Sequence, residues 1–77
     1  MTYGEKAVGL SFNPSKDPDV DAVKKLYARI IDLCAKYRAA AVDPATKSPE
    51  RARLFSIAIT QAQAAQMWAV KAFTWQD

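Results

Sequence analysis

A group of residues near the start of the chain could together bind a nucleotide. An aromatic ring in the turn-forming run 11–15 can stack on a flat base. An asparagine and a serine beside a proline supply short hydrogen-bonding groups. Two adjacent lysines, about two turns into the following predicted helix, offer positive charge to a phosphate. The predicted ligand-binding residues are Phe12, Asn13, Pro14, Ser15, Lys24 and Lys25.

Each of these residues also has a structural explanation. Phe12 can anchor the N-terminal segment on a neighbouring subunit, the asparagine–proline pair can simply form a turn, and adjacent lysines often lie on a solvated helix face. Asp17, Asp19 and Asp21 place negative charge at the start of the helix, where a phosphate would otherwise be welcome. On the residues alone, the structural interpretation has more support.

Catalytic and metal chemistry have little support in the composition. The 77 residues include no histidine, one cysteine and two glycines, so the usual metal ligands, proton shuttles and phosphate-binding loops are missing. Cys34 falls on a predicted apolar helix face, which favours a core role over that of a nucleophile. We therefore expect no enzyme, no cofactor and no metal site.

The charge pattern permits an anionic partner without requiring one. Eleven Lys and Arg residues against eight Asp and Glu give a net charge of +3, and the basic residues are scattered along the chain. This argues against binding to long nucleic acids. Arg51, Arg53 and Lys71 could line a second anionic pocket only where symmetry brings several copies together. The polar N-terminus does not resemble a signal peptide, and a single cysteine fits a reducing compartment, so we expect a cytoplasmic protein.

Two helices are predicted to position these residues. Asp-Pro at 17–18 and Ser-Pro at 48–49 each place a capping side chain before a proline, and proline suits the first position of a helix. Apolar residues then recur every three or four positions in the first helix. We expect a single all-α domain over residues 1–77, an antiparallel hairpin with an ordered arm at 1–17, helices at 18–41 and 49–75, and a loop at 42–48.

The second predicted helix indicates assembly. Residues 54–70 (LFSIAITQAQAAQMWAV) carry no charge, and their apolar side chains occupy nearly the whole circumference of the helix. Three glutamines in this segment argue against a membrane span. One partner helix covers only part of such a surface, so we expect a homo-oligomer with Trp68 and Trp75 as interface anchors.

Several runs resemble a known family, the bacteriophage anti-CBASS sponges, which sequester the cyclic oligonucleotides used as alarm signals by bacterial CBASS immunity. The similar residues cover most of the chain but include no catalytic signature. They are the runs GLSFNPS at 9–15 and DPDVD at 17–21, then Lys24, Ile31 and Asp32, and the runs AIT at 58–60 and AQMWAVK at 65–71.

This resemblance implies a homohexamer that binds cyclic dinucleotides between interlocked protomers without cleaving them. Phe12 would stack on a base and Lys24 would lie near a phosphate, while residues 13–15 would shape the wall. Some members also hold cyclic trinucleotides in separate pockets, whose residues we do not assign. Some relatives carry tyrosine in place of Phe12, so a phenolic hydrogen bond is lost here while stacking is retained. A slip of one residue would turn Lys25 toward the phosphate instead, by about 100° around the helix, and we favour Lys24.

The leading hypothesis is thus a phage sponge acting in the host cytoplasm by mass action. The alternative is an oligomeric structural or adaptor protein that binds another protein, with the arm as a strap between subunits. That alternative explains the second helix equally well, but it predicts no nucleotide binding. A nucleotide-degrading enzyme is disfavoured by the missing histidine.

Overall fold

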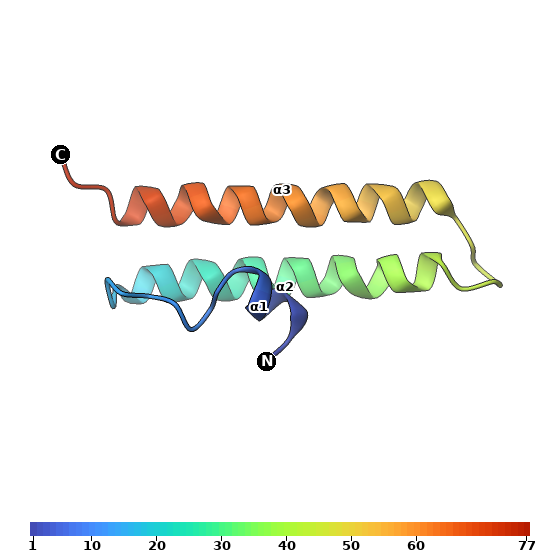
Figure 1. Cartoon of the computed structure of the whole chain (residues 1–77), viewed down its shortest axis with the longest axis horizontal. Helices are drawn as coiled ribbons and strands as arrows, with labels where there is room; N and C mark the ends of the chain where they lie inside the picture. The colour runs from blue at the N-terminus through green and yellow to red at the C-terminus, as the bar shows by residue number, and fades with distance from the viewer.

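Two long antiparallel helices make up most of the molecule. The computed structural model describes residues 1–77 and contains three helices and no strand: α1 (Tyr3–Ala7), α2 (Pro18–Ala41) and α3 (Pro49–Phe73). Figure 1 shows α2 and α3 side by side, with α1 crossing the middle of α2. The start of α2 and the end of α3 lie at the same end of the hairpin. The predicted all-α hairpin is confirmed.

Capping side chains fix where the long helices begin. The Asp17 carboxylate accepts a hydrogen bond from the Asp19 amide at 2.8 Å, and Pro18 follows as the first helical residue. The Ser48 hydroxyl does the same for the Arg51 amide at 3.3 Å. The helix α3 ends at Phe73, before the position 75 expected from the sequence. Thr74 is its C-cap, and the Thr74 amide donates a hydrogen bond to the Val70 carbonyl at 3.0 Å.

The arm, expected to be ordered but to carry no helix, contains the short helix α1. Thr2 and Glu5 form a capping box, in which each side chain accepts a hydrogen bond from the other residue's backbone amide. The amide of Gly4 donates to the Asp32 carboxylate at 2.7 Å, and a Cβ at this position would collide with the Ala28 carbonyl. Glycine therefore lets α1 sit directly on the backbone of α2.

The core is small, and much apolar surface stays open. Only 10 of the 77 residues are buried, and the central cluster is Val8, Ala28, Ile31, Ile59 and Ala62. A stripe at helical spacing on α2 lies in solvent, with each side chain 49–58 % exposed. We call this the α2 stripe; it consists of Leu26, Ile30, Leu33 and Tyr37.

Neither of the two long helices, nor α1, combines the length and the apolar character needed to cross a bilayer.

Candidate functional site

Five of the six residues predicted to bind a ligand line one pocket. Its volume is about 250 Å³, and it lies where the arm passes the start of α2 and the end of α3. Beside the predicted residues it is lined by three that the sequence analysis missed. Val20 lies one turn before Lys24 on α2, while Val70 and Thr74 come from the end of α3, so only knowledge of the helix register could have found the last two. The lining residues are Phe12, Asn13, Pro14, Ser15 and Lys24, with Val20, Val70 and Thr74; we call this the Phe12 pocket.

Lys24 of α2 holds the arm in place. Its side chain reaches back across the arm and is only 4 % exposed. The ammonium donates hydrogen bonds to the carbonyl of Gly9 at 2.9 Å and to that of Phe12. It also lies 5.7 Å from the centroid of the Phe12 ring, within the range of a cation–π contact. One lysine thus fixes both the backbone and the ring of the residue predicted to stack on a base.

The polar atoms of Asn13 and Ser15 shape the arm itself. The Asn13 amide donates to the Asp17 carbonyl and to the Asp21 carboxylate, both at 3.0 Å. The Ser15 hydroxyl donates to the Asn13 side-chain oxygen at 2.6 Å and accepts from the Asp17 amide. These bonds lock the turn. They also engage one oxygen of the Asp21 carboxylate, whose negative charge remains at the start of α2.

Phe12 is fixed at its backbone, and its ring is exposed. Its amide donates to the Gly9 carbonyl at 2.9 Å, in a turn that Gly9 permits with a φ of +63°. The side chain nevertheless remains 71 % exposed. An anchored aromatic ring with an open face is the arrangement expected of a stacking platform.

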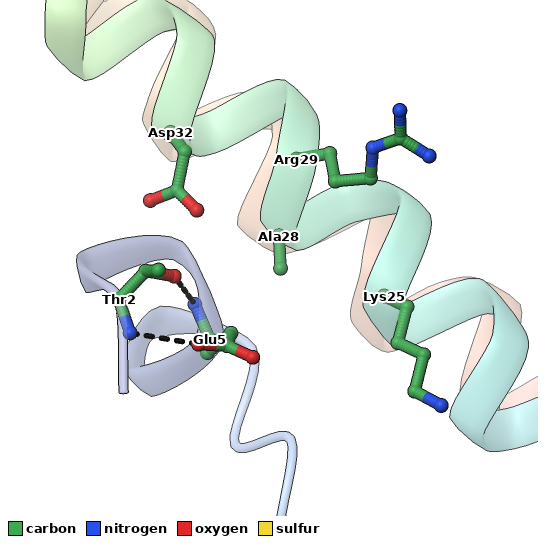
Figure 2. A pocket seen from close by; sticks show the side chains of 6 residues that line it. All are labelled: Thr2, Glu5, Lys25, Ala28, Arg29 and Asp32. Atoms are coloured by element: carbon green, nitrogen blue, oxygen red, sulfur yellow. Dashed lines mark hydrogen bonds between the residues drawn. The ribbon is translucent and has the colours of Figure 1, made fainter.

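Lys25 lies apart from the Phe12 pocket. It lines a separate pocket of about 370 Å³ with Arg29, between α2 and the capping box of α1 (Figure 2). In Figure 2 the Lys25 and Arg29 side chains extend away from Thr2 and Glu5. The structure therefore brings Lys24, and not Lys25, next to the predicted stacking ring.

The remaining candidates are distant from this site. Cys34 is half-buried against the core, and no cluster of histidine, cysteine or acidic residues could hold a metal ion. Glu50 and Arg53 form an exposed ion pair at the start of α3, with a nitrogen–oxygen distance of 2.6 Å. This pairing lowers the pKa of the Glu50 carboxyl and raises the pKa of Arg53.

The hairpin and its pocket can be compared with known proteins. The family model for the hairpin domain of Acb2/Tad1 matches residues 5–74, which is nearly the whole chain. The chain belongs to the Acb2/Tad1 hairpin family. This confirms the resemblance to anti-CBASS sponges noted from the sequence. No curated protein and no solved structure matches the chain.

Membership of the Acb2/Tad1 family sets the general kind of function. It is a family of binding proteins of the sponge type, directed against bacterial defence, and not a family known for enzymes. The matched range begins inside α1 and ends at Thr74, so every residue lining the Phe12 pocket lies within the Acb2/Tad1 hairpin domain.

Proposed function

We propose that the protein binds cyclic dinucleotides at the Phe12 pocket and sequesters them, which denies the CBASS effector its activating ligand. The observation that carries this proposal is the pairing of Phe12 with Lys24. The ring is largely exposed and held in place, and a buried ammonium lies 5.7 Å from its centroid. A base stacked on the ring would bring its own phosphate toward that charge.

Lys24 can serve the arm and a phosphate together. An ammonium has three N–H donors, and two of them are directed at the Gly9 and Phe12 carbonyls. The third is available to a phosphate oxygen. Because the side chain is already ordered by its contacts with the arm, a ligand would lose little additional side-chain entropy on binding. We therefore assign Lys24 to bind the phosphate of the ligand, while Asn13, Pro14 and Ser15 form the wall of the pocket.

The site is completed by a second copy of the chain. A pocket of about 250 Å³ is smaller than the roughly 300–1,000 Å³ usual for small-molecule sites, so one protomer encloses only part of a cyclic dinucleotide. The exposed α2 stripe supplies an apolar surface for a neighbouring protomer. We propose a homohexamer, as the family resemblance implies, with each ligand held between protomers. Cyclic trinucleotides would bind in separate pockets between subunits.

The ligand leaves the site unchanged in this proposal. The chain has no histidine to move a proton, and the family acts by binding. The expected place of action is the host bacterial cytoplasm, where the signalling nucleotides are made. Sequestration requires only affinity and copy number, because a bound ligand no longer contributes to the free concentration.

A second candidate function is an oligomeric adaptor that binds another protein. It is favoured by the same exposed Phe12 ring, which would insert into a neighbouring chain, and by the α2 stripe. An adaptor would bind no nucleotide, and substitution of Phe12 would lower the stability of the oligomer.

Calorimetric titration of the purified protein with cyclic di- and trinucleotides tests the proposal. We expect tight binding. When the complex is heated to denature the protein, chromatography should show that the released ligand is intact. Binding followed by loss of the ligand would indicate an enzyme, while absence of heat with every nucleotide would leave the adaptor.

A further inference from the structure

A second pocket adjoins the Phe12 pocket. Its volume is about 510 Å³, and it is lined by arm residues 6–9 and by Gln63, Gln66 and Met67 of α3. Phe12 and Lys24 line both pockets, so the two pockets adjoin at these residues. A ligand with two bases could therefore extend from one pocket into the other.

Gln66 is a polar residue that the packing of the hairpin does not explain. It is only 5 % exposed, and apart from Lys24 no polar or charged residue is buried as deeply. The Lys24 ammonium is paired with carbonyls, but the Gln66 side chain makes no hydrogen bond within the chain. No fully enclosed side-chain nitrogen or oxygen lacks a partner, so the Gln66 amide must open onto the pocket it lines. Water can bind the amide there in the free protein, and a ligand that displaces this water must supply equivalent hydrogen bonds.

The helical spacing places a second amide beside the first. Gln63 and Gln66 are three residues apart on α3 and share one face, with Gln63 half-buried. One turn further along that face, Val70 lines the Phe12 pocket. The two glutamines thus form the polar end of a helix face that runs past both pockets.

We infer that this second pocket is a base subsite in which Gln66, assisted by Gln63, recognises adenine. The inference rests on the proposed function. An amide presents one acceptor and one donor side by side, which match the N6 and N7 positions of adenine. The corresponding edge of guanine presents two acceptors and suits arginine or lysine. Two lysines also line this pocket: Lys24 donates to the arm carbonyls and is assigned to the phosphate, and Lys6 is exposed. The buried polar group left to face a base edge is therefore the Gln66 amide, which favours adenine over guanine.

The first test compares two ligands on two variants. Cyclic di-adenosine and cyclic di-guanosine monophosphate are titrated into the wild-type protein, Gln66→Met and Gln61→Met. Methionine keeps the length and helix propensity of glutamine but removes the amide. Gln61 is exposed and lines neither pocket, so it is the matched control. We expect the adenine-to-guanine affinity ratio to fall about tenfold in Gln66→Met and to stay unchanged in Gln61→Met.

A second test changes one atom of the ligand instead of the protein. A 7-deaza-adenine cyclic dinucleotide lacks the N7 acceptor, and it should bind the wild-type protein about tenfold more weakly than the parent. Gln66→Met should bind the two equally. If the wild-type protein binds neither cyclic dinucleotide, the proposed function and this inference both fail. If it binds them but the ratio and the 7-deaza effect survive in Gln66→Met, the adenine subsite is wrong and the sponge function stands.

Discussion

The Lys24 ammonium donates a hydrogen bond to the carbonyl of Phe12 and lies 5.7 Å from the centroid of the same residue's ring. The position of the Phe12 backbone and the positive charge beside its ring therefore depend on the same side chain, Lys24. A ligand that stacks on Phe12 meets an ammonium whose orientation is already set. This relationship distinguishes Lys24 from its neighbour Lys25, which lines a different pocket.

Replacement of Lys24 should loosen the arm. Lys24→Met leaves the carbonyls of Gly9 and Phe12 without their donor, and hydrogen bonds to a charged group contribute about 1.5–3 kcal/mol each. Hydration of the two freed carbonyls offsets part of this loss, so we expect faster amide exchange at Phe12 and a free energy of unfolding in urea that is lower by about 1–3 kcal/mol. Lys25→Met is the control and should change neither. Equal amide exchange rates in the two variants would contradict the role of Lys24 in holding the arm.

Removal of the Phe12 ring should affect binding more than folding. The ring is 71 % exposed, so Phe12→Ala should change stability by less than about 0.5 kcal/mol. Affinity for a cyclic dinucleotide should fall by about 1–3 kcal/mol, the usual contribution of a base stacked on an aromatic ring. Tyr3→Ala removes another exposed aromatic ring, one that lines neither pocket, and calorimetry should show no loss of affinity. Unaltered affinity in Phe12→Ala would remove this ring from the site.

A methyl group at Gly4 should displace α1. The added Cβ would meet the Ala28 carbonyl and lie 2.9 Å from the Asp32 carboxylate, so Gly4→Ala should destabilise the chain by about 1–3 kcal/mol. Thermal unfolding measures the loss, and Ser11→Ala in the exposed part of the arm is the control. A melting temperature equal to that of the wild type would mean that α1 packs elsewhere.

A charge on the α2 stripe should block assembly without unfolding the protomer. Leu33 is 56 % exposed in the single chain, so Leu33→Asp is tolerated there. In an oligomer the same carboxylate would be desolvated without a partner. Analytical ultracentrifugation should show a smaller species, while circular dichroism should show the same helix content. An unchanged sedimentation coefficient would place the interface on another face.

The ion pair at the start of α3 predicts a dependence on acid. Arg53 lowers the pKa of Glu50 below its ordinary value of 4.5, so the carboxylate binds protons less readily when folded. Its stabilising effect is therefore present above that value and is lost as the pH falls through the lowered pKa. Glu50→Gln should remove this part of the acid dependence, measured by helix content against pH. Carbon-detected NMR titration of Glu50 checks the shift directly.

The helices were more predictable from the sequence than the site. Asp17 and Ser48 before prolines signal helix starts locally, and the family resemblance rests on short contiguous runs. The capping box of Thr2 and Glu5 was also a local signal, but the nearby glycines obscured it. The contributions of Val70 and Gln66 could not be predicted, because they depend on the register between helices far apart in the sequence.

The thinness of the hairpin determines how it responds to dilution. The molecule measures 51 × 24 × 12 Å, which is about the thickness of a single helix layer, so the chain has two faces but hardly an inside. In the proposed homo-oligomer, the protomer that covers the α2 stripe is part of the folded state, so a higher protein concentration stabilises the fold. The unfolding midpoint should rise with concentration. In the proposed sponge, whose ligand sites lie between protomers, binding capacity should therefore rise more than in proportion to protein concentration.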